Sequence, residues 1–329
     1  MGDSDDLNPI RGVTVVVVSF NTQDHLRRCL ASVGPGIPIV VVDNASEDGS
    51  PEMVRREFPH VQLIALDCNV GFGAANNLGI ARATTPLILL LNSDAEARPG
   101  SIRRLAEVFV QFPDAVAAGG RLEFPNGRIQ LSSSGPLTLW AVFCEQFFVE
   151  PALRLFGLPG YWNSHRYRTT TPVTQVMGAC LMMKPIERFN PDYFLYCEDT
   201  DLCHRLQRHG SIFYCPEAVF THALGGSSPS VSRWLSVARY NAGKERYFRL
   251  HHGRIAAAIC WVLNRLGALL RLMVWLVLTL VTLGSIDAFR RKLVIFARVL
   301  TAPVGGPKRP ECSDQEHHRD DLPPRSDHP

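Results

Sequence analysis

Three short polar clusters follow apolar stretches of this chain, where hydroxyl, amide and carboxylate groups could bind a ligand. They are Ser19-Phe20-Asn21, Asp43-Asn44 and Asn92-Ser93-Asp94. Turns favour Ser, Asn and Asp for reasons of their own, so one such cluster alone means little. Three clusters, each after a predicted strand, predict a binding site at one edge of a sheet.

A fourth group, Glu198-Asp199-Thr200-Asp201, supplies three carboxylates at the start of a helix predicted over Leu202–His209. Carboxylates this close repel one another, which raises the pKa of at least one of them. A raised pKa suits a general base that takes a proton from a hydroxyl group. The same acids could instead only complement the positive end of the helix dipole.

The elements that would position these groups alternate along the first part of the chain. Strands are predicted over Val13–Val18, Ile39–Val42, Val61–Ala65 and Leu87–Leu91. Helices are predicted over Gln23–Val33, from Ser50, over Asn76–Ala83 and from Pro99 to about Phe112. This alternation predicts an α/β fold with a mainly parallel, Rossmann-like sheet flanked by helices.

The alternation stops after Ala118. Residues 121–174 are expected to form irregular loops or a short hairpin, and Val176–Met183 a strand. A last short strand is expected before His222. The chain carries no Gly-rich phosphate loop or dinucleotide fingerprint, which disfavours ATP hydrolysis and NAD chemistry.

The composition is that of a protein with a real core: 329 residues, 46% hydrophobic and 20% charged. It excludes a disordered chain, a collagen-like repeat and a coiled coil. Nine scattered cysteines suit a reducing compartment. Residues 1–11 lack the apolar stretch of a secretion signal and are expected to be disordered.

The C-terminal part is basic and apolar. Residues 233–309 hold 14 Lys or Arg against two acids, within a chain of net charge +3. Leu272–Ile286 is an uncharged run, but it is shorter than the roughly 20 residues of a spanning helix. We therefore expect membrane-associated helices over 231–300 that lie on or re-enter the bilayer, anchored by Arg290-Arg291-Lys292. A single span, a buried dimer interface and a helical subdomain without lipid contact remain alternatives, and 301–329 is expected to be a disordered tail.

The ordered set of motifs resembles a known family. VVVVSFNTQDHLRRCLASV, IVVVDNASEDGS and NVGFGAANNLGIARATTPLILLLNSDA resemble the nucleotide-sugar domain of inverting family 2 glycosyltransferases. GACLMMK, FLYCEDTDLCHRLQRHG and FTHALGGSS are similar to its rhamnosyltransferase-like branch. The resemblance implies a GT-A domain over 12–230, with a nucleotide-sugar half at 12–118 and an acceptor half at 119–230.

The resemblance also implies roles for residues of the strand ends. Asp43 would hydrogen-bond the pyrimidine base. The rest of the nucleotide-sugar pocket would comprise Ser19, Phe20, Asn21, Asn44, Gly71, Asn76, Asn92 and Ser93. The family's Asp-x-Asp reads Asn92-Ser93-Asp94 here, so Asp94 would be the one carboxylate on Mg²⁺ or Mn²⁺. His222 would complete the metal or diphosphate site, with a purely structural histidine as the alternative.

In the acceptor half, the resemblance makes Asp199 the catalytic base. Glu198 and Asp201 would bind the acceptor or support the base, and Arg205 would pair with a diphosphate or a carboxylate. The chain departs from the family at 188–192, where acids usual in the family are replaced. A zinc site at Cys197, Cys203, His204 and Cys215 is disfavoured, because their spacing fits no Cys-x₂-Cys pair.

The expected function is transfer of L-rhamnose from dTDP-β-L-rhamnose, with inversion, onto a saccharide carried on polyprenyl diphosphate. The expected location is the cytosolic face of the membrane, with a homo-oligomer left open and no nucleic-acid partner. The alternatives are a UDP-sugar donor such as UDP-GlcNAc or UDP-galactose, and a non-catalytic, membrane-docked glycan-binding scaffold. A nucleotidylyltransferase is disfavoured, because no Gly-rich basic loop follows the first strand.

Overall fold

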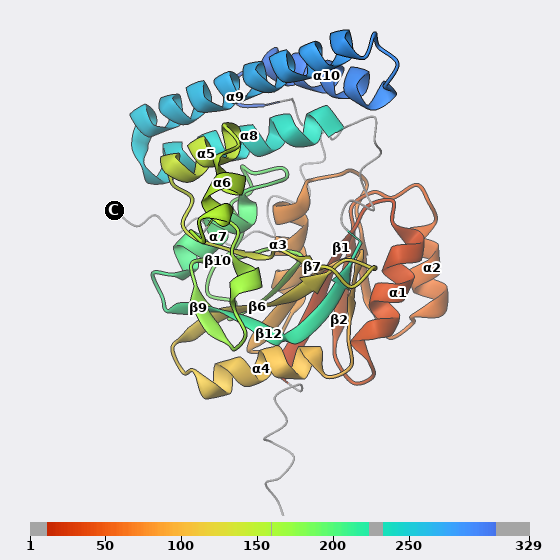
Figure 1. Cartoon of the computed structure of the whole chain (residues 1–329). Helices are drawn as coiled ribbons and strands as arrows, with labels where there is room; N and C mark the ends of the chain where they lie inside the picture. The colour runs from red at the N-terminus through yellow and green to blue at the C-terminus, as the bar shows by residue number, and fades with distance from the viewer. Residues whose placement is uncertain (1–11, 159, 224–232, 307–329) are drawn as a thin grey trace, which may run out of the picture.

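A ten-stranded sheet organises the molecule (Figure 1), in a computed structural model that describes residues 12–158, 160–223 and 233–306. Its main path runs β3-β2-β1-β4-β11-β6-β12-β5, with β7 paired to β6 and β9 to β12. The strands are β1 Val13–Ser19, β2 Ile39–Asp43, β3 Gln62–Ala65, β4 Leu87–Asn92, β5 Ala95–Ala97, β6 Ala115–Glu123, β7 Ile129–Gln130, β9 Thr171–Val173, β11 Cys180–Met183 and β12 Ser211–His222. A separate pair joins β8 (Ser133–Ser134) to β10 (Gln175–Val176). The termini that the sequence predicts to be disordered lie largely outside the described residues.

The sheet is mainly parallel, as predicted. β1 pairs in parallel with both β2 and β4, and β2 pairs in parallel with β3. β11 is inserted antiparallel between β4 and β6, while β12 runs parallel to β6. The chain builds outward from β1 to β3 and then returns to β4 on the other side of β1. This reversal opens a crevice at the carboxyl ends of β1 and β4, where ligands of α/β sheets bind.

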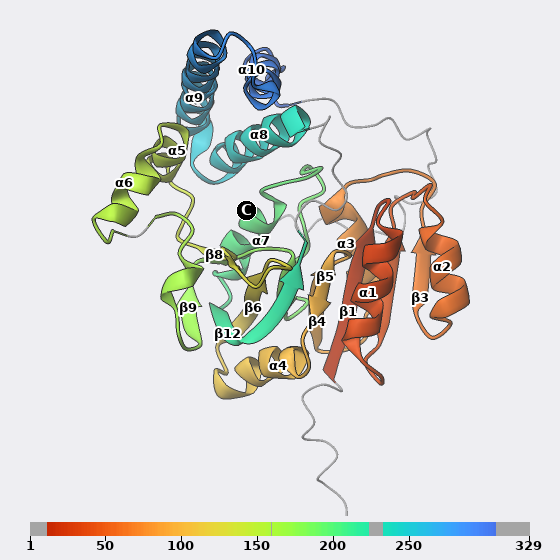
Figure 2. The same cartoon turned by 45° about the vertical axis from the view of Figure 1, so that its right-hand side comes forward.

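Helices cover both faces of the sheet (Figure 2). The helices α1 (Gln23–Val33), α2 (Ser50–Glu57) and α4 (Ser101–Gln111) contribute to the core on one face. The helices α3 (Phe72–Arg82) and α7 (Glu198–Leu206) contribute to the core on the other. The β1 side chains alternate between these two cores, which explains its continuous β-branched sequence. The predicted α/β class is therefore confirmed.

The structure corrects the prediction for residues 121–174. β6 continues to Glu123, and two helices follow: α5 (Leu139–Gln146) and α6 (Val149–Leu155). Thr138, directly before α5, is a residue type that favours the start of a helix. In the structure its hydroxyl accepts a hydrogen bond from the Ala141 amide at 3.1 Å. The sequence did not predict these helices, because their apolar residues are not all on one buried face: Val142 is buried, whereas Trp140 and Leu155 are exposed. The single strand predicted over Val176–Met183 is divided between β10 and β11.

Three helices form a layer beside the sheet (Figures 1 and 2). They are α8 (Arg233–His251), α9 (Gly253–Val281) and α10 (Asp287–Leu300). α5, α8 and α9 share a small core of their own, made by Leu137, Val142, Tyr247, Phe248, Ala257 and Cys260. The 29-residue α9 is much longer than the uncharged run that the sequence offers.

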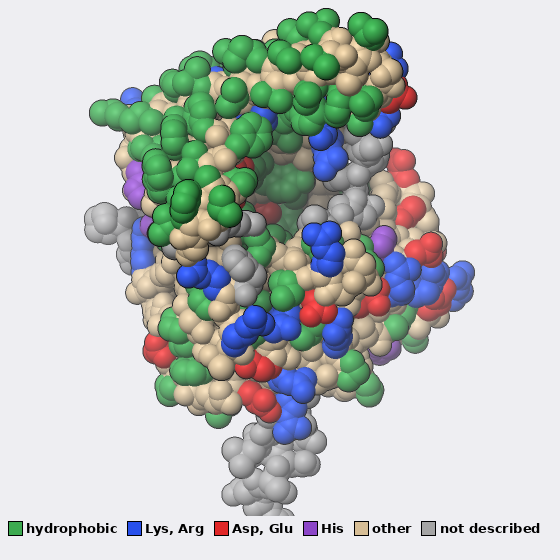
Figure 3. Space-filling view, viewed as in Figure 1, with side chains coloured by type: hydrophobic (Ala, Val, Ile, Leu, Met, Phe, Trp, Pro, Cys, Tyr) green, Lys and Arg blue, Asp and Glu red, His purple; other side chains and the backbone are tan. Residues whose placement is uncertain are grey.

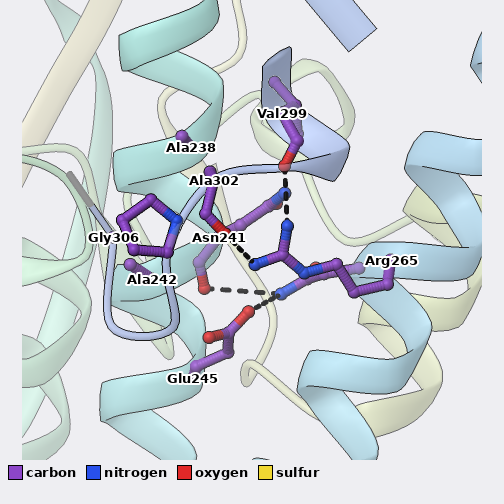
Figure 4. A pocket seen from close by; sticks show the side chains of 10 residues that line it. Ala238, Asn241, Ala242, Glu245, Arg265, Val299, Ala302 and Gly306 are labelled. Atoms are coloured by element: carbon purple, nitrogen blue, oxygen red, sulfur yellow. Dashed lines mark hydrogen bonds between the residues drawn. The ribbon is translucent and has the colours of Figure 1, made fainter. Parts of the chain in front are cut away.

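The two arginines within the apolar part of α9, Arg265 and Arg271, explain this difference. Arg265 donates to the backbone oxygen of Val299, in the last turn of α10, and to that of Ala302, just after α10, both at 2.7 Å (Figure 4). Arg271 donates to the backbone oxygens of Glu145 at 2.8 Å and Gln146 at 2.6 Å, at the end of α5. Carbonyls at a helix C-terminus lack partners within their helix, and cations are favoured there. Both charges of the apolar stretch therefore face protein.

A small polar cavity lies where α8, α9 and the end of α10 meet (Figure 4). Asn264 of α9 donates to Glu245 Oε1 at 3.0 Å and to the Asn241 backbone oxygen at 3.4 Å. Gln146 of α5 donates to Asn264 Oδ1 at 3.3 Å. These contacts join α8 and α9 to α5, so two helices of the layer are attached to α5 through specific polar contacts.

The outer surface of this layer is apolar (Figure 3). Among the described helices, α9 is long and apolar enough to cross a membrane. Only 17% of its most apolar 18-residue stretch is buried within the protein. The exposed apolar side chains of α9 include Ile255, Ile259, Val262, Leu266, Met273, Val277, Leu280 and Val281. Near α5 and α6 they include Trp140, Phe148, Leu155 and Phe156. Such an extended apolar surface is uncommon on a soluble monomer.

Candidate active site

A chain of hydroxyl groups joins the carboxyl ends of β1 and β4. Ser19, which is fully buried, lies 3.1 Å from the Thr22 hydroxyl, which donates to Ser93 at 2.9 Å. These residues lie at the crevice that the strand order creates. The structure therefore brings together two of the sequence-predicted clusters and adds Thr22, which the sequence analysis did not single out.

Asp43 closes β2 and has one carboxylate oxygen to spare. Its Oδ1 accepts from the Ser46 amide at 2.8 Å, whereas its buried Oδ2 has no hydrogen-bond partner among the described residues. Burial raises the pKa of Asp43. A buried acceptor without a partner is costly, so a donor supplied by a ligand would be favoured here. An N–H group of a pyrimidine base is a donor of the required kind.

The neighbouring polar residues mostly hold loops in place. Asn44 donates to Asn69 at 2.9 Å and accepts from the Val70 amide at 2.9 Å, which ties the β2 end to the loop before α3. Asn21 accepts from the Glu47 amide at 2.8 Å, which joins the β1 and β2 loops. The Asn76 side-chain amide donates a hydrogen bond to the Phe72 backbone oxygen within α3. The side chains of these three predicted site residues are thus engaged with protein, where they hold the loops at the ends of β1 and β2 and the start of α3.

Asp94 and His222 meet at the end of β4, although 128 residues separate them in sequence. His222 Nε2 lies 3.1 Å from Asp94 Oδ1, and its Nδ1 lies 2.8 Å from Gln130 Oε1. Asn92 Nδ2 is 3.3 Å from the same Nε2, and the buried Asn92 Oδ1 has no partner among the described residues. Gln130 carried no signal in the sequence, because only the pairing of β6 with β7 brings it here.

The residues around Asp94 fit a divalent cation. Two adjacent ligands of an octahedral ion with bonds of about 2.1 Å lie about 3.0 Å apart, which is close to the Asp94–His222 separation. Within the described part of the chain, no three His, Cys, Asp or Glu side chains form a metal cluster. A cation here would therefore take two protein ligands and complete its shell with phosphate oxygens and water, as Mg²⁺ commonly does.

Asp199 lies at the start of α7, facing the glycine turn before β11. Its Oδ2 accepts from the Gly178 amide at 3.0 Å and its Oδ1 from the Thr200 amide at 2.8 Å. Burial raises the pKa of Asp199, although its side chain remains partly accessible. A carboxylate that is both accessible and raised in pKa can act as a general base. Gly178 belongs to the GACLMMK motif, which was the one available signal for this contact.

Glu198 is the more deeply buried neighbour. Burial and the charge of Asp199 raise the pKa of Glu198 to about 8. Its Oε2 has no hydrogen-bond partner among the described residues. Glu198 is therefore held protonated at neutral pH, which leaves the negative charge on Asp199.

The backbone before α7 is strained. Tyr196 and Cys197 both adopt positive φ, at 74° and 66°. Asn21 and Ala45, just after β1 and β2, do the same at 52° and 66°. Left-handed conformations of non-glycine residues cost of order 1–3 kcal/mol each, and they cluster at functional sites. Here they occur in the loops that present the predicted ligand-binding and acidic residues.

Asp201 and Arg205 do not join this site. Arg205 pairs with Asp201 at 3.0 Å and with Glu187, and His251 of α8 lies 2.8 Å from the other Asp201 oxygen. Burial alone would raise the pKa of Asp201, but His251 and Arg205 hold it below its usual range. Arg205 thus pairs with carboxylates, one of the two kinds of partner that the sequence analysis allowed, and the contact between His251 and Asp201 joins α7 to α8.

The segment at 188–192 that departs from the family is fastened to α3. The Phe189 amide donates to Asn77 Oδ1 and its backbone oxygen accepts from Asn77 Nδ2, both at 2.8 Å. Asn190 uses its side chain to accept from the Asp192 amide at 3.0 Å. These contacts position the loop that leads to Asp199, so the segment has a structural role without the missing acids.

Comparison with known proteins gives a consistent result. Residues 14–157 match the family model described as glycosyl transferase family 2. An N-acetylglucosaminyl-diphospho-decaprenol L-rhamnosyltransferase of Mycobacterium tuberculosis is 27% identical over 246 residues, 63% of this chain and 75% of that protein. The succinoglycan biosynthesis protein ExoO of Rhizobium meliloti is 38% identical over 146 residues, 40% of this chain and 42% of that protein. A mannosyltransferase of Pyrobaculum calidifontis, solved with GDP-Man and Mn²⁺, has 16% identity and a TM-score of 0.47, with 88% of this chain and 85% of that chain covered. These matches identify residues 14–157 as a glycosyltransferase family 2 domain and the chain as a glycosyltransferase that is similar to an L-rhamnosyltransferase of that kind.

Proposed function

We propose that this enzyme transfers L-rhamnose from dTDP-β-L-rhamnose, with inversion, to a saccharide carried on polyprenyl diphosphate. The observation that carries the proposal is the placement of Asp43, the Asp94–His222 pair and Asp199 at one end of the sheet domain, each with a group suited to one part of the reaction. The mycobacterial relative is named for L-rhamnosyl transfer to a decaprenyl diphosphate sugar, which supports the choice of donor sugar and acceptor.

In this mechanism Asp43 accepts a hydrogen bond from the thymine base through its spare Oδ2. Asp94 and His222 would hold Mg²⁺ or Mn²⁺, which stabilises negative charge on the departing diphosphate. Asp199 takes the proton of the acceptor hydroxyl as that oxygen attacks the anomeric carbon. The bond from the anomeric carbon to the diphosphate oxygen breaks on the opposite side, and dTDP leaves with both bond electrons. Attack from the far side inverts the β-linked donor to an α-rhamnoside.

The apolar helical layer supports a membrane location. Since Arg265 and Arg271 face protein, the outer surface of α9 presents apolar side chains to its surroundings. Arg271 ties the later part of α9 to α5, so a fully spanning α9 would draw α5 into the bilayer with it. We therefore propose that α9, with α10 and the exposed side chains of α5 and α6, lies in the membrane surface on the cytosolic side. Lys292 lies 4.0 Å from the Trp275 ring centroid and would meet the headgroups.

The first experiment screens donors. Purified protein with Mg²⁺ or Mn²⁺ is mixed with dTDP-, UDP- and GDP-sugars, and melting is followed, because a ligand that binds the native state raises the melting temperature. Stabilisation by dTDP-rhamnose that is lost in Asp43→Ala supports the proposal. Stabilisation only by UDP-sugars would replace the donor, and folded protein that responds to none would favour a non-catalytic scaffold.

The membrane proposal has its own test. Co-sedimentation with vesicles of anionic lipid is compared for the native chain, Val277→Glu on the outer surface of α9, and Val110→Glu on α4. Val277 is 58% exposed and Val110 is 72% exposed, so both changes add one charge at an exposed valine. We expect only Val277→Glu to reduce sedimentation. Equal behaviour of the two variants would contradict this docking surface.

A further inference from the structure

Arg239 of α8 lies over the loop that leads to the proposed base. Its guanidinium carbon is 4.7 Å from the centroid of the Phe194 ring. The residues four and seven positions further on, Gly243 and Arg246, face the same loop. A Cβ at Gly243 would lie 2.6 Å from the Tyr196 backbone oxygen, and Arg246 lies over the Tyr193 ring. This face of α8 therefore runs along residues 193–197, directly before Asp199.

Neighbouring cations are neutralised by carboxylates, but Arg239 is not. Lys244 pairs with Glu145 at 3.1 Å, and Arg246 pairs with Asp192 at 3.1 Å. Across the described residues, Arg239 makes neither a hydrogen bond nor an ion pair, and its guanidinium lies over the Phe194 ring. Burial lowers the pKa of Arg239, so this half-buried guanidinium has lost part of its water without gaining an anion. A cation–π contact offsets only about 0.5–2 kcal/mol of such a cost.

Arg239 also lies close to the donor side of the site. The ring beneath it belongs to Phe194, whose backbone oxygen accepts from the Phe72 amide at 2.9 Å. Gly71, at φ 91°, packs against the same Phe194, and a Cβ there would lie 2.5 Å from that oxygen. Next to Arg239 in sequence, the Tyr240 ring centroid lies 6.3 Å from that of Tyr196, in the loop that leads to α7. Arg239 therefore lies against a loop that contacts Gly71 and Phe72 on one side and leads to the proposed base on the other.

The opposite side of α8 faces the apolar layer. Ala238, Asn241, Ala242 and Glu245 line the small cavity that α8 shares with α9 and the chain after α10 (Figure 4). α8 is thus the wall between the reaction site and the membrane-docking helices. A hollow beneath the helical layer, with acidic side chains inside it and basic ones near its rim, is visible in Figure 3.

We infer that Arg239 binds the diphosphate of the lipid-linked acceptor, an inference that rests on the proposed function. In such an acceptor the diphosphate lies between the sugar, which must reach Asp199, and the lipid, which must reach the apolar layer. Arg239 occupies the intervening helix, and a planar guanidinium can donate two parallel hydrogen bonds to phosphate oxygens. The donor also carries a diphosphate, but the proposed place for that group is the pair formed by Asp94, in the turn after β4, and His222, at the end of β12.

The test separates the two diphosphates. Arg239→Ala and Arg239→Lys are compared with Arg246→Ala, a control that removes an arginine from the same helix face. Rates are measured with a polyprenyl-diphosphate-linked sugar and with an alkyl glycoside of that sugar, which lacks the diphosphate. Calorimetry measures dTDP binding. We expect Arg239→Ala to raise the KM for the diphosphate acceptor about tenfold, equal to about 1.4 kcal/mol, with partial recovery in Arg239→Lys.

The alkyl glycoside kinetics, dTDP affinity and the Arg246→Ala enzyme should change little. Equal losses with both acceptors would make Arg239 a structural residue, and weaker dTDP binding would assign it to the donor.

A binding measurement keeps the inference independent of turnover. Neutral vesicles containing a short polyprenyl diphosphate should retain the native protein better than vesicles containing the matching polyprenol, and Arg239→Ala should abolish the difference. If transfer fails in every assay but this difference persists, the diphosphate site stands and the proposed reaction falls. No difference for the native protein would overturn the site.

Discussion

Replacing Arg271 with Met tests how the apolar helix α9 is held. Arg271 donates to the backbone oxygens of Glu145 at 2.8 Å, Gln146 at 2.6 Å and Gly267 at 3.1 Å. Its guanidinium also lies 4.5 Å from the Phe148 ring centroid. Methionine keeps the helix propensity and the apolar contacts, so the change removes chiefly the charge and its hydrogen bonds.

The expected loss can be worked out from these contacts. Hydrogen bonds to charged groups contribute about 1.5–3 kcal/mol each, and two of them, to Glu145 and Gln146, join separate helices. Two bonds at the lower end of that range give about 3 kcal/mol. Packing of the methionine side chain would return about 1 kcal/mol of this, because it buries roughly one additional methylene. We expect Arg271→Met to lower the free energy of unfolding of the layer by about 2 kcal/mol.

Tryptophan fluorescence in urea is a suitable assay, because Trp140, Trp234, Trp261 and Trp275 all lie in α5, α8 or α9. The matched control is Arg254→Met, which makes the same change at an exposed position of α9. The control should unfold like the native chain. If Arg271→Met is as stable as the control, or binds vesicles better with no loss of stability, then Arg271 faces lipid and the reasoning is wrong.

Three further predictions concern the site. Asp199→Asn should lower kcat by about 10²–10⁴-fold and leave dTDP affinity unchanged, and an unchanged kcat in steady-state assays would remove Asp199 as the base. Because the folded pKa of Glu198 is raised from 4.5 to about 8, the folded state holds this proton more tightly than the unfolded chain, so native stability should fall as pH rises from about 4.5 through 8. Urea titrations at several pH values should show that Glu198→Gln removes part of this fall; an identical pH dependence would refute the assignment. Gly71→Ala places a Cβ 2.5 Å from the Phe194 backbone oxygen at φ 91°. Thermal melting should therefore show a loss of at least about 1 kcal/mol in the free energy of unfolding, and donor binding should weaken. Native-like stability and binding would show that the loop can relax.

Much of the sheet could be predicted because its sequence pattern is local. The continuous β-branched runs of β1 and β2 reflect burial on both faces, which any parallel arrangement requires. The polar residues that follow them lie at the carboxyl ends as predicted, and Asp43 there keeps one buried carboxylate oxygen without a partner among the described residues. Helix starts were less well predicted: α3 begins at Phe72, because Gly71 reverses the chain there, whereas the apolar spacing suggested Asn76.

Residue types and local spacing determined the α/β class, the strand ends and the acidic cluster at Glu198–Asp201, because these depend on neighbours along the chain. Only the tertiary structure decided which polar groups meet. The insertion of β11 places Gly178 against Asp199, and β12 returns His222 to Asp94. Asp201, a carboxylate two residues after the proposed base, instead pairs with Arg205 and His251. In the sequence, the arginines of α9 interrupt an apolar stretch, as they would in a broken membrane segment. In the structure they donate hydrogen bonds to backbone oxygens at the ends of α10 and α5. Partners that are distant in sequence, such as Asp94 and His222, leave no periodic signal, so their selection is a property of the packed molecule.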